Sequence, residues 1–176
     1  MQVEFEATFV NVNKDEIRAK LKAAGANLLR PEFMQKRVVF NMPEGHGIKG
    51  GWLRVRDEGN KNTMSLKVMD GEGIERQKEI EIPVNDFELA AAMLENIGCQ
   101  NKAHQESLPA LWELGGVDIT IDEWPFLEPF VEVEGATERV VEEVSEKLGF
   151  DYSMALFDSV DAQYSAKYNI SIDQIN

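Results

Sequence analysis

Acidic residues separated by one position recur along this chain. Alternate side chains of a β-strand share a face, so each such pair would place two carboxylates on one side of a sheet. Carboxylates on neighbouring strands repel each other unless a positive charge lies between them. Either water solvates them on an outer sheet face, or they hold a hard divalent cation, which prefers oxygen ligands. The candidate metal ligands are Glu4, Glu6, Glu81, Asp122, Glu132 and Glu134.

Basic residues with the same alternating spacing accompany the acidic ones. An arginine grips phosphoryl oxygens with two nitrogens in a fork, whereas a lysine acts as a point charge. Several carboxylates beside several cations suit a magnesium-bound polyphosphate better than a bare anion or a calcium ion. The candidate substrate-binding residues are Arg37, Arg54, Arg56, Lys67, Lys102 and His104.

Most segments that carry these residues alternate between apolar and charged positions. This period of two is typical of strands with one buried face. Strands are predicted at 3–10, 33–41, 52–57, 63–69, 75–82, 101–107 and 111–114, and at 117–134, where two strands flank a turn at Pro125.

Helices are predicted where a capping residue precedes an apolar stripe of helical period. They begin after Asn13, after Asn85 and from Thr137, and a last one covers 159–168. The expected buried stripe of the second helix consists of Leu89, Met93, Leu94 and Ile97.

The apolar strand faces have these amphipathic helices to pack against, whereas the charged faces have none. If the sheet stays open, the charges form a solvated surface. A sheet that curls into a barrel to remove its edges would instead turn them into the lining of a lumen, which must hold water, ions or a charged ligand. We predict an α+β fold, mainly antiparallel, with an eight-stranded closed β-barrel and helices packed outside. One domain is expected to cover residues 1–176.

Charge and composition narrow the range of partners. The chain has 176 residues, with 18 basic and 32 acidic ones, and a net charge of −14. A field of that sign argues against nonspecific binding to nucleic acid or to anionic membranes. The single cysteine, Cys99, excludes an internal disulfide and a cysteine-based zinc site. Because the first residues lack the pattern of a secretion signal and no apolar run has membrane-spanning length, we expect a cytoplasmic protein.

The order of the charged motifs resembles the CYTH superfamily, the triphosphate tunnel metalloenzymes. That family includes class IV adenylate cyclases, thiamine triphosphatases and tripolyphosphatases. Its motifs are an ExExK strand, paired arginines, a lysine on the next strand, a second ExE, a KxR strand and an acidic ending. In this chain they correspond to residues 4–8, 53–56, 65–67, 79–81, 102–104 and 121–134. The resemblance covers nearly the whole chain and keeps the order of the motifs.

This resemblance implies a tunnel that binds a small-molecule triphosphate together with Mg²⁺ or Mn²⁺. Family members hydrolyse a phosphoanhydride or cyclise ATP to cyclic AMP and pyrophosphate, and the chain is most similar to the bacterial class IV cyclase-like branch. The resemblance further implies Glu4, Glu6 and Glu134 as catalytic residues and suggests a homodimer. No single residue decides between cyclisation and hydrolysis.

Two positions depart from the family pattern. Thr8 stands where the family has lysine, and His104 stands where arginine is usual. Each change removes a permanent cation, although a histidine close to a triphosphate can become protonated. A catalytically weakened module that binds polyphosphate or nucleotide is therefore the alternative to an enzyme. A third hypothesis is an acidic interaction protein, which magnesium and tripolyphosphate together would not stabilise.

Overall fold

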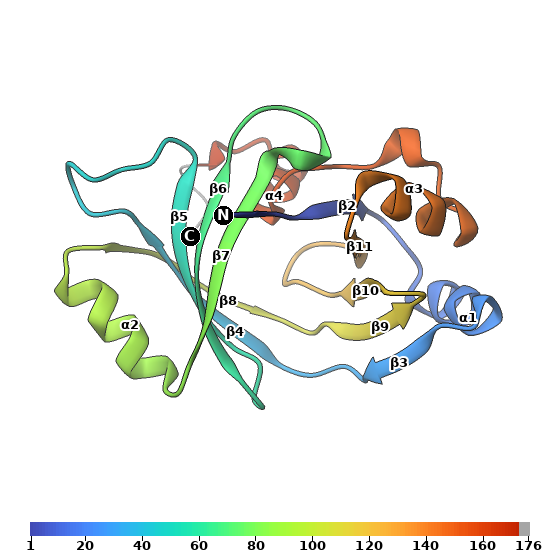
Figure 1. Ribbon diagram of the computed structural model, residues 1–176, viewed down its shortest axis with the longest axis horizontal. Coiled ribbons are helices and arrows are strands. Elements are labelled where there is room, and N and C mark those ends of the chain that lie inside the picture. The colour runs from blue at the N-terminus through green and yellow to red at the C-terminus, as the bar shows by residue number, and fades with distance from the viewer. Residues whose placement is uncertain (173–176) are drawn as a thin grey trace.

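The computed structural model describes residues 1–172 and shows an α+β fold in which every strand pairing is antiparallel (Figure 1). The helices are α1 (Lys14–Ala24), α2 (Phe87–Asn96), α3 (Glu138–Lys147) and α4 (Val160–Tyr168), with short 3₁₀ turns η1 (Ile74–Arg76) and η2 (Tyr152–Met154). The fold class predicted from the sequence is thereby confirmed at this level.

The strands of the described residues form two sheets. One has six strands in the order β1 (Gln2–Val3), β7 (Gln77–Val84), β6 (Asn62–Met69), β5 (Gly51–Asp57), β4 (Gln35–Asn41) and β8 (Gln100–Ser107). The other has five strands in the order β2 (Phe5–Phe9), β11 (Phe130–Gly135), β10 (Val117–Asp122), β9 (Ala110–Leu114) and β3 (Asn27–Arg30).

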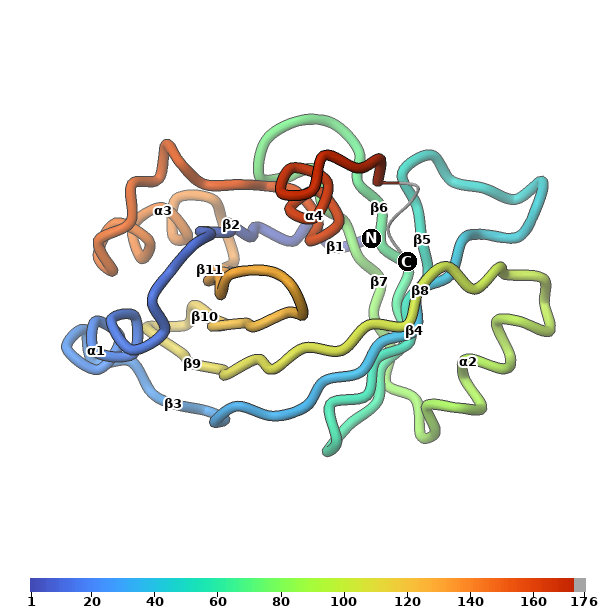
Figure 2. Tube along the Cα trace, turned by 180° about the vertical axis from the view of Figure 1, so that it is seen from behind, coloured from blue at the N-terminus to red at the C-terminus, as the bar shows by residue number. Residues whose placement is uncertain are grey.

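Three chain segments pass from one sheet to the other. β1 continues into β2 after Glu4, β3 leads into β4, and β8 leads into β9. The strands form a circuit. Pairings lead from β2 through β11 and β10 to β9, and the chain then leads from β9 back to β8. From β8 the pairings continue through β4, β5, β6 and β7 to β1, which the chain joins to β2. The two sheets therefore face each other around a common interior, and Figure 2 shows them from behind on opposite sides of it.

The predicted single closed barrel is not confirmed, because neither sheet of the described residues closes on itself. The ladders stop where the chain crosses between sheets. Pro31 lies at one crossing and Pro109 at another, and proline has no N–H to donate to a ladder. At the two proline crossings the Phe33 N–H donates to the Pro109 carbonyl at 3.2 Å. At the third crossing the Glu4 N–H donates to the Gln77 carbonyl at 3.0 Å and extends the pairing of β1 with β7.

The outer faces of both sheets carry the hydrophobic core. On the five-stranded sheet, Ile119 and Val133 are fully buried and pack with residues of α1 and α3, among them Leu21 and Val141. On the six-stranded sheet a second cluster forms under α2 and includes Phe40. Because alternate residues point to opposite faces, burial of these apolar side chains directs the polar residues between them toward the interior.

The helices begin close to the predicted positions. The Asn13 side chain accepts hydrogen bonds from the backbone of Asp15 and Glu16, and Thr137 caps α3. The second helix begins one residue later than predicted, because Asp86, rather than Asn85, accepts a 2.9 Å hydrogen bond from the Leu89 N–H. In residues 1–172 no helix has both the length and the apolar character to span a membrane.

The predicted buried stripe of α2 is wrong for three of its four residues. Leu89 is 71% exposed, Met93 53% and Ile97 60%, whereas Leu94 is 3% exposed. The helix carries apolar residues on several sides, so the period alone does not identify the buried face. Its alanines, Ala90 and Ala91, face the sheet with Leu94.

Two truncations in α2 test this orientation. Leu94→Ala should lower the free energy of unfolding by about 2–5 kcal/mol, because it leaves a cavity in the core. Leu89→Ala, which removes the same atoms from the exposed face, should change it by no more than about 0.5 kcal/mol. Urea unfolding followed by circular dichroism measures both, and equal losses would contradict the orientation of the helix.

Candidate active site

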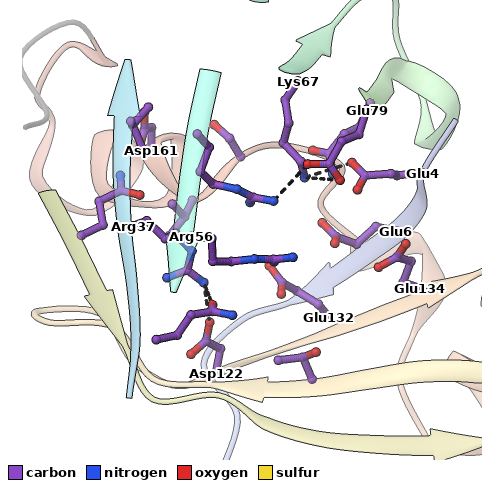
Figure 3. A pocket seen from close by; sticks show the side chains of 18 of the residues that line it. Glu4, Glu6, Arg37, Arg56, Lys67, Glu79, Asp122, Glu132, Glu134 and Asp161 are labelled. Carbon is purple, nitrogen blue, oxygen red and sulfur yellow. Dashed lines mark hydrogen bonds and ion pairs between the residues drawn. The ribbon is translucent and has the colours of Figure 1, made fainter. Parts of the chain in front are cut away.

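A cavity of about 800 Å³ lies between the two sheets. Figure 3 shows acidic and basic side chains pointing into it from both sides. Of the residues predicted for the site, those lining this cavity are Glu4, Glu6, Arg37, Arg54, Arg56, Lys67, Glu81, Lys102, Asp122, Glu132 and Glu134.

The strand cations of the cavity all lie on one wall. Within residues 1–172, the arginines and lysines that line it from a strand belong to the six-stranded sheet: Arg37, Arg54, Arg56, Lys67 and Lys102. The strands of the facing wall, in the five-stranded sheet, contribute acidic side chains and no cation. The cavity is therefore polarised between a cationic wall and an acidic wall.

Glutamates of β7 neutralise the two arginines of β5. A nitrogen of Arg54 lies 3.0 Å from Glu79 and 3.6 Å from Glu81, and a nitrogen of Arg56 lies 2.8 Å from Glu81. The Nε atom of Arg56 lies 3.1 Å from Glu58, whereas the buried Nε atom of Arg54 has no hydrogen-bond acceptor in the described part of the chain. Arg54 thus keeps one donor that the described residues do not satisfy.

Lys67 links the β7 glutamates to the N-terminal strand. Its ammonium lies 3.0 Å from a Glu4 oxygen and 3.9 Å from Glu79. Burial, followed by the hydrogen bond to Glu79, raises the pKa of Glu4, although Lys67 opposes the shift. Burial would also raise the pKa of Glu79, but the hydrogen bond from Glu4 and the charges of Lys67 and Arg54 lower it. The two carboxyls therefore share one cation and favour holding one proton between them.

Several acidic residues that line the opposite wall, Asp118 among them, have no cationic partner in the described part of the chain. Within the described ranges, Glu6, Glu132 and Glu134 form no salt bridge, and Glu6 stands directly opposite Glu134 in the pairing of β2 with β11. Figure 3 shows these three side chains together on one side of the cavity. We refer to Glu6, Glu132 and Glu134 as the acidic triad.

Two members of the acidic triad, Glu132 and Glu134, have raised pKa values. Burial and then the neighbouring Glu6 carboxylate raise the pKa of Glu134 to about 7. Burial, Glu6 and Asp122 raise the pKa of Glu132 well above its ordinary value. Uncompensated carboxylates with raised pKa values are groups that a divalent cation would stabilise.

Asp122 belongs to a hydrogen-bonded cluster rather than to the triad. It is 2% exposed, and one of its oxygens accepts hydrogen bonds from Trp124 Nε1 at 2.8 Å and from Ser107 Oγ at 3.2 Å. The Arg37 guanidinium lies 3.8 Å from the same oxygen and stacks 4.5 Å from the centre of the Trp124 ring. Its other oxygen accepts a hydrogen bond from the Glu123 N–H, and this cluster fixes the carboxylate beside Arg37. The role of Asp122 as a metal ligand stays a prediction.

Burial shifts both partners of this cluster toward neutrality. It lowers the pKa of Arg37 to about 10, against the opposing effect of Asp122, and it raises the pKa of Asp122. Arg37 nevertheless remains charged at neutral pH and lines the cavity.

Plain alternation along the predicted strand 101–107 would place Lys102 and His104 on one face, but the structure places them on different faces. The pairing of β4 with β8 shifts by one residue between Val39 and Phe40: Val39 pairs with Ala103, but Phe40 pairs with Asn101. The extra residue, Lys102, forms a β-bulge, which reverses the alternation beyond it. Lys102 consequently lines the cavity, whereas His104 is exposed and contacts Asn101 at 3.0 Å.

Thr8 stands on the acidic wall, where it pairs with Glu132 across β2 and β11. It is 2% exposed, and its backbone exchanges two hydrogen bonds of 2.9 Å with Leu156. Cross-strand partners share a face, so a lysine at position 8 would have put a cation beside Glu132. Threonine leaves Glu132 without that partner.

The sequence did not identify three charged residues that line the cavity near α4. Arg76, which falls within the predicted strand 75–82, lies instead in the 3₁₀ turn η1, where strand alternation does not apply. Asp158 and Asp161 precede and begin α4, and both line the cavity. Their contacts depend on how the last helix packs, for which the sequence carries no local signal.

The residues present suit a divalent metal ion chemically, although no ready-formed cluster exists. Among residues 1–172, no three acidic, histidine or cysteine side chains converge closely enough to hold a metal. The acidic triad nevertheless offers oxygen donors that lack a cation, which is the ligand type that Mg²⁺ and Mn²⁺ prefer. Binding would require these side chains to rotate toward one another.

The ion pairs on the cationic wall lead to a binding prediction. Glu79→Gln removes a negative charge held by Arg54 and Lys67, so tripolyphosphate should bind about tenfold more tightly in the absence of metal. Glu106→Gln, on the exposed side of β8, is the control and should leave the affinity unchanged. Calorimetric titration in the presence of a chelator measures this, and weaker binding to the Glu79 variant would show that Glu79 does not compete with phosphate.

The raised pKa of Glu134 predicts a pH dependence of stability. Its pKa is about 7 in the folded chain against an ordinary 4.5, so the folded state binds the proton more tightly. The contribution to the free energy of unfolding is therefore present below about pH 4.5 and is lost as the pH rises to about 7. In metal-free buffer, Glu134→Gln should abolish this loss of stability with rising pH. We expect the loss in the unmodified chain to be about 1 kcal/mol, because solvent screens a partly exposed group. Parallel pH profiles of the variant and the unmodified chain would contradict the shift.

Comparisons with known proteins bear on the family and the fold of the chain. A sequence model of the CYTH domain matches residues 8–163, a range that begins just after Glu4 and Glu6. A search of curated proteins gives no significant match. The PH1012 protein from Pyrococcus horikoshii is similar in structure, with a TM-score of 0.75 and 21% identity over 89% of this chain and 96% of that one.

Two further solved structures resemble the chain. A candidate adenylate cyclase from Vibrio parahaemolyticus has a TM-score of 0.79 and 16% identity over 93% of this chain and 98% of that one. HpAC1 from Hippeastrum is a candidate adenylyl cyclase described as revealing a dominant triphosphatase activity. It has a TM-score of 0.64 and 13% identity over 98% of this chain and 100% of that one. At these identities the likeness concerns the fold, and the match of the family model decides the family. The chain belongs to the CYTH domain family.

Proposed function

We propose that this chain binds a small-molecule triphosphate together with a divalent metal ion and cleaves one of its phosphoanhydride bonds. The observation that carries the proposal is the polarity of the cavity, with strand cations on one wall and the acidic triad on the other. A metal-bound triphosphate carries both charges that such a cavity needs, since its phosphates suit the cations and its metal suits the carboxylates.

On the cationic wall, Arg54, Arg56 and Lys67 would hold the phosphate oxygens. The unsatisfied Nε atom of Arg54 provides a donor for them at no cost to existing contacts. Full engagement also requires the cations to leave Glu79 and Glu81, so binding is an exchange of carboxylate for phosphate. These residues orient the triphosphate and stabilise the charge that grows on the leaving phosphate.

On the acidic wall, Glu6, Glu132 and Glu134 would hold the metal, with Mg²⁺ or Mn²⁺ as the proposed ions. When bound, such an ion neutralises phosphate charge and makes phosphorus easier to attack. The lack of a lysine at position 8 leaves Glu132 available for this role. We propose Glu4 as a residue that positions Lys67 across the cavity, since the two are 3.0 Å apart.

Hydrolysis of tripolyphosphate and cyclisation of ATP both break a phosphoanhydride bond, and a product assay separates them. The protein is incubated with Mg²⁺ or Mn²⁺ and either substrate, and the products are resolved by ion-exchange chromatography. Orthophosphate from tripolyphosphate identifies a hydrolase, whereas cyclic AMP with pyrophosphate identifies a cyclase. Binding without any product would identify the binding module instead.

Removing one carboxylate from the acidic triad should abolish the reaction while leaving the fold intact. Glu6→Gln is expected to lower turnover at least about a hundredfold, because the metal loses a charged ligand. Glu106→Gln makes the same chemical change on the exposed outer side of β8 and should retain full turnover. Circular dichroism checks that both variants are folded, and undiminished turnover in Glu6→Gln would refute the assignment of the acidic wall.

A further inference from the structure

The C-terminal segment, residues 158–172, lies against one end of the cavity. Both Figure 1 and Figure 2 place its helix, α4, between β2 and β6. Five residues at its start, 158–162, line the cavity together with Arg76 and Lys102. Figure 3 shows Asp161 on the opposite side of the cavity from Glu6 and Glu134.

Two carboxylates of this segment are paired with cations of the cavity. Asp158 lies 2.7 Å from Arg76, and Asp161 lies 2.8 Å from Lys102. The second pair is largely shielded from water, with Asp161 15% and Lys102 22% exposed in their side chains. These carboxylates therefore occupy cations that face the space where an anionic ligand would lie.

Arg76 also retains an unused donor. Its Nε atom is buried and has no hydrogen-bond acceptor among the described residues, although its terminal nitrogen pairs with Asp158. A single carboxylate thus leaves this guanidinium partly unsatisfied. A phosphate group offers three acceptor oxygens and more charge, so it would satisfy the same guanidinium more fully.

The segment is attached through polar contacts that can be exchanged. None of the residues of α4 is buried. Tyr164 and Tyr168 donate hydrogen bonds of 2.6 and 2.7 Å to the carbonyls of Pro125 and Phe126, and Lys167 pairs with Glu128 at 2.7 Å. Because no buried apolar side chain anchors the helix, releasing the two aspartates removes much of what holds its first turn to the cavity.

We propose that Arg76 and Lys102 form a second anion-binding subsite, which Asp158 and Asp161 occupy in the ligand-free chain and which phosphate groups of the substrate take over. This rests on the proposed function, because the ligand is the same triphosphate. The C-terminal segment then acts as an internal competitor: its carboxylates lower the affinity for the triphosphate, and binding releases the start of α4.

The test is a calorimetric titration with tripolyphosphate in the presence of magnesium. Asp158→Asn/Asp161→Asn should bind about tenfold more tightly than the unmodified chain, because two carboxylates no longer compete. Glu143→Gln/Glu146→Gln makes the same change in net charge on α3, away from the cavity, and should alter the affinity by less than about twofold. Adding Arg76→Met to the Asp158→Asn/Asp161→Asn variant should remove most of the gain.

Each outcome has a distinct meaning. If the unmodified chain binds tripolyphosphate and the aspartate variant binds no better than the α3 control, the internal competition is refuted while the proposed function stands. If neither binds, the proposed function and the subsite both fail. Hydrogen exchange provides a second readout, since amides of 158–168 should exchange faster when tripolyphosphate is bound. Slower exchange would mean that the segment closes over the ligand, and would overturn the proposal.

Discussion

A row of ion-paired side chains of alternating charge along the inner face of the six-stranded sheet determines the charge of the cavity. Each member lies within 4 Å of the next, in the order Lys61, Glu58, Arg56, Glu81, Arg54, Glu79, Lys67 and Glu4. Unpaired charges in such a cavity would be costly, so the cations of the wall need these partners when no ligand is bound. The same pairs keep the arginines extended into the cavity and ready for another anion.

The strands of the acidic wall contribute no cation to the cavity in the described part of the chain, and this determines how its carboxylates are neutralised. With threonine at position 8 and His104 outside, no strand cation of the described chain reaches the acidic triad. Protons or a metal can neutralise Glu132 and Glu134, and these alternatives exclude each other at a given carboxylate. Metal and triphosphate should therefore support each other's binding: the metal displaces protons on one wall while phosphate displaces carboxylates on the other.

Strand alternation predicted most of the residues that point into the cavity. When the apolar side chains of a strand are buried on one face, the residues between them must lie on the other face. The inward positions of Glu6, Arg54, Lys67 and Glu134 follow from Ile119, Val133 and similar residues packing outward. The prediction failed where the backbone departs from a plain strand, at the bulge around Lys102 and at the 3₁₀ turn of Arg76. It also failed for α2, whose apolar residues surround the helix. The contacts of Asp158 and Asp161 could not be predicted, since they depend on the docking of a distant helix.

The route by which the chain encloses its interior has a consequence for folding kinetics. The N-terminal strands join partners far along the chain: Gln2 pairs with Glu79, and Phe9 pairs with Val131. Such pairings require long loops to close before any contact is gained, which makes a fold slow to form. The hairpins of β4 to β7 and of β9 to β11 are local and can form early. The N-terminal strands, which complete the cavity and supply Glu4 and Glu6, would then be the last to be fixed during refolding.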